Sequence, residues 1–286
     1  MKEYMKIAIE QAKKSLREGN HGFGAIIVRE NEVIAAAYDT EETENDSTAH
    51  AEMNVIKKAS KKVGKNLKDC VLITTHEPCP MCATAVVWAK IKKIVYGYSI
   101  DDAIKQDRGR INIPCKEIFE RSNNKIEIVK GVLKEECALL YNKEIRTEIK
   151  KLRNVTTEQL KNYNEESKLK RLEWFQTCIS EEIKYSEDPK KTAYKLLLKR
   201  FNILENEAPI VESSQEKIIF HSKNFCPTLE ACKILELDTK NICKLYNEQS
   251  TDALIKQIDN SLRFTRNYDK LRPNSNYCEE MIIVDK

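Results

Sequence analysis

The first half of the sequence predicts an α/β fold built around one mixed sheet. Short stretches rich in β-branched residues alternate with longer segments in which apolar residues recur at helical spacing. Helical segments separate the later strands, and a helix between two strands is typical of a parallel pair. The predicted strands are 23–28, 33–38, 71–75, 94–98 and 126–129, and the predicted helices are 2–18, 50–59, 81–90 and 134–150.

The first three elements are predicted from periodicity and from the residues that interrupt it. The segment 2–18 places Met5 and Leu16 among the apolar residues of one helix face, and Gly19 follows its end. Two β-branched stretches come next, and Asn31 marks the turn between them. We therefore expect a helix followed by a hairpin.

The later elements are predicted from their start and stop signals. Ser47 or Thr48 suits the N-cap of the helix 50–59. Pro80 suits the first turn of the helix 81–90, where a missing N–H group costs nothing. Gly131 ends the last strand and precedes a long helical segment. These signals support five strands, with helices between the later ones.

The second half of the sequence predicts a separate, mostly helical domain. Between residues 151 and 164 the apolar pattern thins and charge rises, so we place a boundary there. The predicted domains are 1–152 and 153–286. In the second domain we expect a first helix over 169–185, further helical segments and one strand at 217–221. We expect the stretch 262–286 to be irregular.

Composition limits the classes of protein to consider. The 286 residues carry a formal net charge of +4, which does not indicate a concentrated nucleic-acid-binding patch. The N-terminal residues lack the apolar core of a signal peptide, and no apolar run is long enough to span a bilayer. Ten cysteines without framework spacing indicate reduced thiols. We therefore expect a cytoplasmic protein that does not engage a membrane.

Two short motifs carry the predicted chemistry. The first supplies His50 and Glu52, and the second supplies Cys79 and Cys82 beside Pro80. Zinc binds nitrogen and sulfur ligands in tetrahedral geometry, and a catalytic Zn²⁺ keeps one position open for water. Cysteines three residues apart at a helix start share one face, and the positive helix end favours thiolates. His50, Cys79 and Cys82 are therefore the predicted metal ligands, and Glu52 the predicted catalytic carboxylate.

A structural zinc site and a redox pair are the two alternatives. A structural site needs four protein ligands, and no fourth partner lies nearby in the sequence. A redox Cys-x-x-Cys pair would leave His50 and Glu52 unexplained. The sequence therefore favours a catalytic zinc site.

The two motifs together resemble the zinc deaminase superfamily, with its His-x-Glu and Pro-Cys-x-x-Cys signature. Within it, the segments 46–52, 77–82 and 131–137 are similar to the guanine deaminase and tRNA adenosine deaminase branch. The resemblance covers roughly the first half of the chain. It implies a three-layer α/β/α fold with a five-stranded mixed sheet, a Zn²⁺ cofactor and a homodimer. It also implies that Glu52 carries protons to the ring and to the leaving amine.

The resemblance also implies residues that contact the substrate. Asp39 stands where this branch usually has an asparagine, and the alternative is a solvated turn residue. Phe23 lies where the family packs the substrate ring, although a strand aromatic is more often part of the core. Ala49 lies within the first motif. Asp102 follows the fourth strand, and the alternative there is a charged, solvated loop.

Three functions are compatible with these observations. The leading hypothesis is a zinc-dependent hydrolytic deaminase of a small nucleobase or nucleoside of guanine type. The second is a tRNA wobble adenosine deaminase, which would act on a splayed base and use the second domain as an RNA clamp. The third is a zinc-binding sensor or scaffold that has lost catalysis, and Glu52 argues against it because binding alone needs no carboxylate there.

The second domain carries its own cysteines. Cys226, Cys232, Cys243 and Cys278 are either metal ligands or buried thiols, and their spacing matches none of the usual metal patterns. The segment 224–232 is similar to the cysteine-containing segment of the L-2-amino-thiazoline-4-carboxylate hydrolase family. We carry no activity over from that resemblance.

Overall fold

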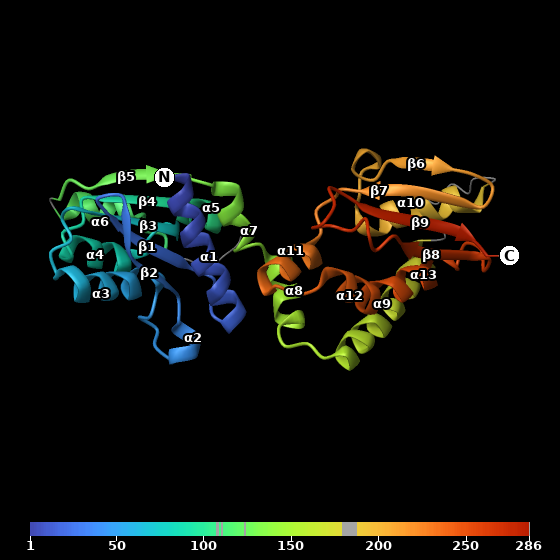
Figure 1. Cartoon of the computed structure of the whole chain (residues 1–286), viewed down its shortest axis with the longest axis horizontal. Coiled ribbons are helices and arrows are strands. Elements are labelled where there is room, and N and C mark those ends of the chain that lie inside the picture. Colours follow the sequence, from blue (N-terminus) through green and yellow to red (C-terminus); the bar gives the residue numbers. More distant parts are fainter. Residues whose placement is uncertain (107–108, 110, 123, 179–187, 286) are drawn as a thin grey trace. The chain divides into compact units, whose positions relative to one another are not determined.

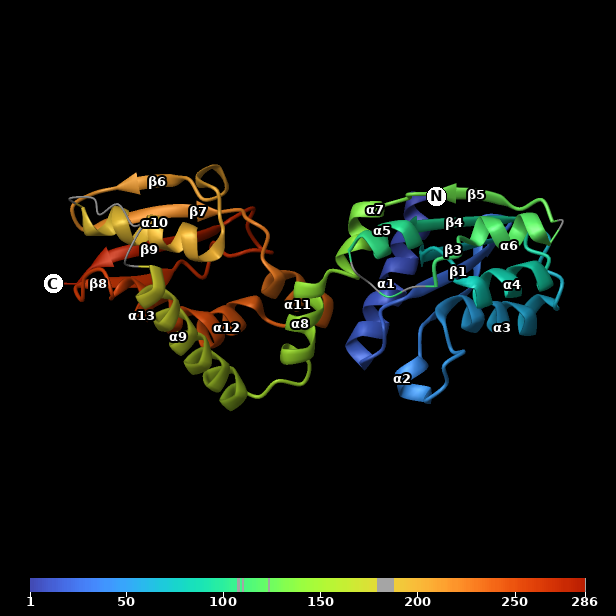
Figure 2. The ribbon, with the colours of Figure 1, turned by 180° about the vertical axis from the view of Figure 1, so that it is seen from behind.

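The computed structural model describes residues 1–106, 109, 111–122, 124–178 and 188–285. The chain divides into two compact units, Met1–Lys150 and Lys151–Lys286. Figure 1 labels their elements, and Figure 2 shows the same ribbon from behind. In the described part of the chain, no helix has both the length and the apolar character needed to cross a bilayer.

The first unit is built on a five-stranded mixed sheet of order β2-β1-β3-β4-β5. β1 pairs antiparallel with β2 and β3, whereas β4 runs parallel to both β3 and β5. This arrangement confirms the predicted mixed sheet. The strands are β1 (Gly24–Arg29), β2 (Glu32–Tyr38), β3 (Cys70–His76), β4 (Lys93–Tyr98) and β5 (Glu127–Lys130).

Helices cover both faces of this sheet and so form three layers. On one face lie α3 (Ala51–Val63), α4 (Pro80–Trp88) and α6 (Cys115–Arg121). On the other face α1 (Lys2–Glu18) packs on β1, and α7 (Lys134–Leu139) packs on β4. A Cβ at Gly24 would lie 2.1 Å from a backbone oxygen of α1, so only glycine allows this close approach.

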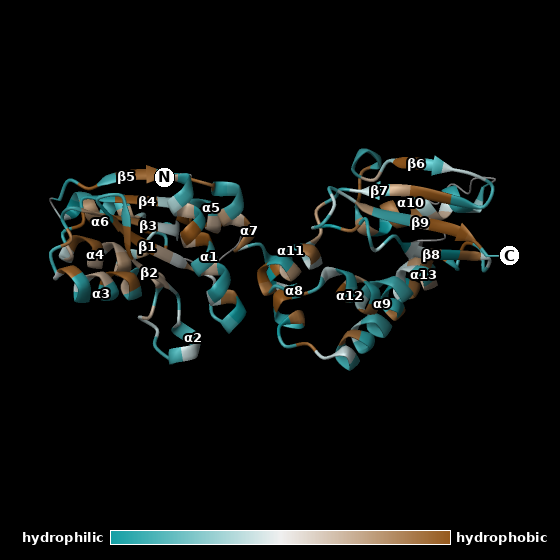
Figure 3. Ribbon diagram, viewed as in Figure 1, coloured by the Kyte–Doolittle hydropathy of each residue, from teal (hydrophilic) through white to brown (hydrophobic). Residues whose placement is uncertain are grey.

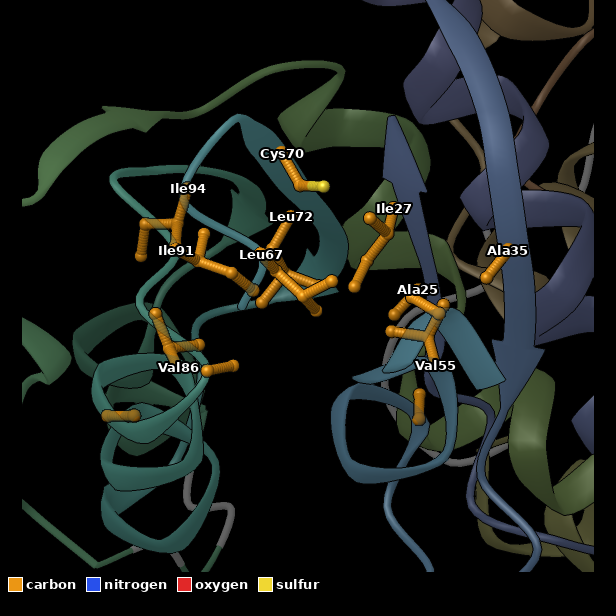
Figure 4. Close-up of a cluster of buried hydrophobic side chains, with 14 of the residues drawn as sticks. Ala25, Ile27, Ala35, Val55, Leu67, Cys70, Leu72, Val86, Ile91 and Ile94 are labelled. Atoms are coloured by element: carbon orange, nitrogen blue, oxygen red, sulfur yellow. The ribbon is translucent and has the colours of Figure 1, made fainter. Parts of the chain in front are cut away.

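The core between the sheet and the first helical layer sets the positions of α3 and α4. Figure 4 shows Ile27 and Leu72, from neighbouring strands, beside the helices that carry Val55 and Val86. All four side chains are fully buried. Burying such a side chain contributes roughly 1.5–3 kcal/mol. The N-terminal ends of α3 and α4, which carry both motifs, are therefore anchored to the same sheet.

Three details of the first unit differ from the prediction. The long helix predicted over 134–150 is two helices, α7 and α8 (Lys143–Leu152), because Asn142 accepts hydrogen bonds from the N–H groups at the start of α8. The loop predicted after the fourth strand contains α5 (Ile100–Lys105), which is capped by Ser99. The polar loop before the first motif contains the short helix α2 (Glu41–Glu44).

The second unit contains a four-stranded antiparallel sheet of order β6-β7-β9-β8. Its strands are β6 (Ile210–Ser213), β7 (Lys217–Ser222), β8 (Leu262–Arg266) and β9 (Cys278–Val284). Helices supply more of its described residues than strands do. They are α9 (Thr157–Cys178), α10 (Pro189–Phe201), η1 (Glu205–Glu207), α11 (Pro227–Leu235), α12 (Thr239–Cys243), the π-helical turn η2 (Lys244–Glu248) and α13 (Gln249–Ile255).

The predicted strand at 217–221 is present as β7, but the prediction for this unit was wrong in three places. The strand β6 was not expected. The stretch 262–286 was expected to be irregular but contains β8 and β9. These strands contribute Phe264 and Ile282 to the hydrophobic core of the unit. Their apolar alternation is interrupted by buried charged residues, which hide it from a periodicity argument. The helix α9 begins at Thr157, well before the expected start at residue 169. Its expected end at residue 185 lies outside the described residues.

Candidate active site

His50 is placed by the loop between α2 and α3. It is the N-cap residue of α3, with extended backbone angles. The preceding loop is held by Asp46, whose carboxylate accepts hydrogen bonds from the backbone N–H and the hydroxyl of Thr48. The imidazole is thereby directed at the start of α4 rather than along its own helix.

Cys79 and Cys82 are placed by the first turn of α4. Cys79 is the N-cap residue, and Pro80 occupies the first turn of the helix. Cys82 lies three residues later and is completely buried. Both sulfur atoms therefore point to one side of the turn, as the three-residue spacing predicts.

The three predicted ligands meet at one point. Nδ1 of His50 lies 3.6 Å from Sγ of Cys82 and 3.7 Å from Sγ of Cys79, and all three donor atoms lie within 4.8 Å of one another. Ligand distances of about 2.0–2.3 Å at tetrahedral angles put neighbouring zinc ligands roughly 3.5 Å apart. One nitrogen and two sulfurs at this spacing fit a zinc ion.

Hydrogen bonds among His50, Cys79 and Cys82 shift the pKa values of all three side chains. The hydrogen bond to Cys79 raises the pKa of His50 to about 9. A hydrogen bond from Cys82 lowers the pKa of Cys79 to about 4. The same bond and burial raise the pKa of Cys82. The cluster thus favours an imidazolium at His50, a thiolate at Cys79 and a thiol at Cys82. Metal ligation requires a neutral imidazole and thiolates, so His50 and Cys82 would each release a proton on binding a metal ion.

Glu52 lies in the same site, in the first turn of α3. Its side chain is only 4% exposed, and burial raises the pKa of its carboxyl group. Oε1 accepts a hydrogen bond from the hydroxyl of Thr74 (2.9 Å), and Oε2 lies 3.5 Å from Sγ of Cys82. The carboxyl group is thus held next to the donor cluster while it is not itself a member of that cluster.

A cavity of about 260 Å³ opens onto these groups. Phe23, His50, Glu52 and Cys79 are among the residues that line it. The remaining lining residues are His21, Glu41, His76, Glu77, Ile100, Ile111 and Arg146. The cavity therefore brings a predicted metal centre, a predicted proton carrier and a predicted ring-packing residue to one place.

Asp39 and Ala49 are buried beside this cavity rather than in its lining. Oδ1 of Asp39 accepts the N–H group of His21 (3.0 Å), and Oδ2 is buried without a hydrogen-bond partner. Burial raises the pKa of Asp39. Ala49 bonds through its backbone, because its carbonyl accepts the N–H group of Thr40. Asp39 is therefore not the solvated turn residue of the alternative reading.

Asp102 lies away from the predicted substrate position. On α5 it forms an ion pair with Lys134 (2.8 Å) and accepts a hydrogen bond from Ser99, and this pairing lowers its pKa. It lines a different, larger cavity of about 1410 Å³. The helix α5, which the prediction lacked, turns its side chain toward α7.

Phe23 was predicted to pack the substrate ring, whereas the other residues of the site named here, His76, Tyr141, Thr74 and Glu41, were not among the predicted site residues. Phe23, His76 and Tyr141 form an aromatic wall with ring centroids 5.2–5.5 Å apart. Thr74 holds Glu52, and Oε2 of Glu41 lies 3.7 Å from Nε2 of His50. The position of Thr74 near the end of β3, shortly before the second motif, is the sequence signal that could have placed it at the site.

Residues 1–98 match the family model of the cytidine and deoxycytidylate deaminase zinc-binding region. A tRNA-specific adenosine deaminase of Bacillus subtilis is 44% identical over 135 residues, which are 47% of this chain and 81% of that protein. A guanine deaminase of the same organism is 42% identical over 102 residues, which are 35% of this chain and 65% of that protein.

The first unit is also similar to solved structures. A structure from a study of A-to-I editing by tRNA:A34 deaminases has a TM-score of 0.43 and 28% identity, covering 49% of this chain and 99% of its own. A guanine deaminase from Nitrosomonas europaea has a TM-score of 0.44 and 25% identity, covering 49% of this chain and 82% of its own.

Proposed function

The chain belongs to the cytidine and deoxycytidylate deaminase zinc-binding family, and from this premise we propose that it is a zinc-dependent hydrolytic deaminase. The substrate is an amino-substituted nucleobase or nucleoside of guanine type, and the products are the oxo compound and ammonia. The zinc-dependent deaminase domain comprises residues 1–152, and residues 153–286 form a second domain with another role.

One observation carries this proposal: a buried carboxylate, Glu52, lies in a cavity beside three donor atoms that fit a zinc ion. His50, Cys79 and Cys82 would hold the metal. A zinc ion bound there lowers the pKa of water to about 7 and so makes a nucleophile available at neutral pH. Glu52 is not one of the three donor residues. A structural zinc site would not need a buried carboxyl group beside its ligands, so the presence of Glu52 favours a catalytic site.

Glu52 is the proton carrier. It takes one proton of the attacking water and gives it to a ring nitrogen of the substrate. It then takes the remaining proton from the new hydroxyl group and gives it to the amine, which leaves as ammonia while the carbon–oxygen double bond of the product forms. Its Oε1 is held by Thr74, which leaves Oε2 on the side of the donor cluster for the transfer. One fixed carboxylate can therefore serve both transfers without rotating away.

The aromatic wall orients the substrate ring. Phe23 and His76 both line the cavity, and Tyr141 supports them from behind with its hydroxyl bonded to Thr75 (2.8 Å). Offset or edge-to-face aromatic contacts add roughly 0.5–1.5 kcal/mol to the burial of a flat ring. Arg146, whose guanidinium donates to the carbonyl of Leu140, also lines the cavity. This wall suits a planar heterocycle.

A second candidate is the deamination of adenosine in tRNA. It is favoured by the 44% identity to the Bacillus subtilis tRNA-specific adenosine deaminase. The same cavity would then take a base splayed out of a loop, and tRNA would be a partner.

The molecule is proposed to act as a homodimer through α4. Trp88, at the end of that helix, is 80% exposed, and an exposed aromatic of this size is typical of a contact surface. We expect light scattering to give the molar mass of a dimer for the wild type and that of a monomer for Trp88→Glu. Leu169→Glu, which changes a 60% exposed residue of the second unit, is the matched control. A monomeric wild type would contradict the homodimer.

The test of function is ammonia release from a panel of free bases, nucleosides and bulk tRNA. Activity on guanine-type compounds but not on tRNA supports the leading proposal, and inosine formed only in tRNA supports the second candidate. Glu52→Gln is the companion variant: we expect it to keep bound zinc and to lose about 10²–10⁴-fold in turnover. Zinc binding with no activity on any substrate would contradict both and indicate a sensor or scaffold.

A further inference from the structure

The face of the second sheet that packs against helices is apolar at one end of its strands and polar at the other. Cross-strand partners share a face, so the register places one set of side chains against the helices. The apolar part of this face is Phe220, Phe264 and Ile282, and the polar part is Ser222, Arg266, Cys278 and Glu280. Figure 3 shows the change along β9, which is teal near its start and brown toward its end. The charged side chains of Arg266 and Glu280 thus lie on the same face of the sheet as the hydrophobic core.

Arg266 is the centre of the polar part. Its side chain is only 9% exposed, and its Nε donates to Oε1 of Glu280 (2.8 Å). Its Nη1 is buried and has no hydrogen-bond partner. A buried donor without a partner costs roughly 1–3 kcal/mol, and more when the group is charged. The buried, unpartnered Nη1 of Arg266 therefore indicates that a hydrogen-bond acceptor from outside the chain binds there.

Arg171, on α9, is a second buried guanidinium. It is 7% exposed and donates only to neutral acceptors, which are Asn247, Ser250 and Thr251. No described carboxylate lies within ion-pair distance of it. An unpaired buried charge is strongly unfavourable, so the fold holds Arg171 here against a considerable cost.

Arg200, on α10, completes the group. Its Nε is buried without a hydrogen-bond partner, and its guanidinium stacks 5.2 Å above the ring of Trp174. The guanidinium groups of Arg171 and Arg200 lie 5.0 Å and 6.0 Å from the centroid of the same ring, that of Phe201. Burial and the charges of Arg266 and Arg200 lower the pKa of Arg171 to about 9. We call Arg171, Arg200 and Arg266 the arginine cluster.

Negative charge on the described residues does not balance this cluster. Glu280 forms the one ion pair with it and also accepts a hydrogen bond from Ser222. The carboxylate of Glu248 instead accepts the hydroxyl of Tyr268. Cys243 is near Arg266, but burial raises its pKa to about 12, so it is a neutral thiol. Three guanidinium groups therefore face one carboxylate.

From the two unpartnered buried donors and the missing counter-charge we infer that the second unit binds a small oxyanion, a carboxylate or phosphate group, at the arginine cluster. Guanidinium groups match both kinds of oxyanion with paired hydrogen bonds. Nη1 of Arg266 and Nε of Arg200 supply donors, and Arg171 supplies charge that its neutral partners leave uncompensated. The ligand is a small molecule, because the cluster is buried among helices and strands.

The test uses the full-length chain, freed of oxyanions by dialysis and held at constant ionic strength with sodium chloride. It is titrated calorimetrically with inorganic phosphate and, in a separate arm, with succinate. We expect saturable binding of one anion per chain, and the tighter arm identifies the chemistry of the ligand. If neither anion binds saturably and neither raises the unfolding temperature above the salt control, the inference fails.

Variants separate the cluster from general surface charge. Arg200→Gln should weaken binding at least about tenfold, the loss expected for one charge-assisted hydrogen bond. Arg263→Gln is the matched control, because Arg263 lies on the same strand as Arg266 but pairs with Asp285 at the surface. Equal weakening by both variants would overturn the inference.

Two further variants keep the result interpretable. If Arg200→Gln does not fold, the double variant Arg266→Met with Glu280→Met removes the ion pair as a unit and leaves no buried carboxylate unpaired. It should abolish binding while circular dichroism stays unchanged, and retained binding would count against the cluster. His50→Ala should bind the anion as the wild type does, so this test does not depend on the proposed deaminase activity.

Discussion

The hydroxyl of Thr74 donates a hydrogen bond of 2.9 Å to Oε1 of Glu52. Thr74 is fully buried on β3, and Glu52 lies on α3 above the sheet. The strand therefore holds one carboxylate oxygen and leaves the other facing Cys82. A catalytic carboxyl group is most effective when its orientation is set before the substrate arrives.

We expect Thr74→Val to reduce turnover by about ten- to a hundredfold, because it removes one hydrogen bond to a charged group without changing the volume of the side chain. Zinc content should stay at the wild-type level, since Thr74 touches no donor atom of the cluster. Thr84→Val, an exposed threonine on α4, is the control. Steady-state ammonia release measures both variants, and unchanged turnover in Thr74→Val would refute the role of this bond.

Removal of the metal should abolish activity and destabilise the first unit. A ligand that binds only the folded state stabilises it by about 4 kcal/mol at a thousand times its dissociation constant. We expect a chelator to lower the unfolding temperature and added zinc to restore it. Cys79→Ser should lose zinc in elemental analysis, whereas Cys70→Ser, a buried thiol outside the donor cluster, should keep it. A chelator that changes neither property would exclude a zinc site here.

Glu41 is expected to support the metal through His50. Its Oε2 lies 3.7 Å from Nε2 of His50, on the side of the ring opposite the two sulfurs. Carboxylates in this position typically change metal affinity by about 10–100-fold. We expect Glu41→Gln to speed zinc dissociation to a chromophoric chelator by a factor in this range. Glu42→Gln, the exposed neighbour that faces His21, should leave the rate unchanged.

Asp39 should make folding stability depend on pH. Burial raises its pKa in the folded chain, so the folded state binds more protons than the unfolded state as pH rises above the ordinary value of 3.8. Stability is then lost as pH rises through the folded pKa. Asp39→Asn should therefore raise the unfolding temperature at pH 7 and lose this advantage near pH 3.

Asp46→Asn is the control for that measurement. The pKa of Asp46 is lowered by hydrogen bonds from Thr48, so removing its charge should not stabilise the chain at pH 7. A gain for Asp46→Asn equal to that for Asp39→Asn would mean that net charge, rather than burial of Asp39, is responsible.

The donor cluster was predictable because its spacing is local. His50 and Glu52 lie two residues apart at one helix start, and Cys79 and Cys82 share the first turn of another. Helical geometry sets the direction of such side chains within a few residues, whatever the rest of the chain does. The five strands of the first unit were predictable for the same reason, because each carries its own β-branched run.

Other parts of the molecule depend on residues far apart in the sequence. Thr74 meets Glu52, and Tyr141 meets Phe23, only because β3, α3 and α7 pack around one sheet. The strands β8 and β9 could not be predicted, because Arg266 and Glu280 interrupt their apolar alternation. Such charges are tolerated inside only once a partner strand brings the opposite charge beside them.

The sequence by itself determined which residues form the donor cluster that fits a metal ion and which carboxyl group lies beside it, because these relations are set within single helical turns. Only the tertiary structure decided how the carboxyl group is aimed, where Asp39 and Asp102 lie, and that the second unit buries an arginine cluster. Hydrogen bonds and ion pairs between distant segments act across space, and no local pattern of residues encodes them.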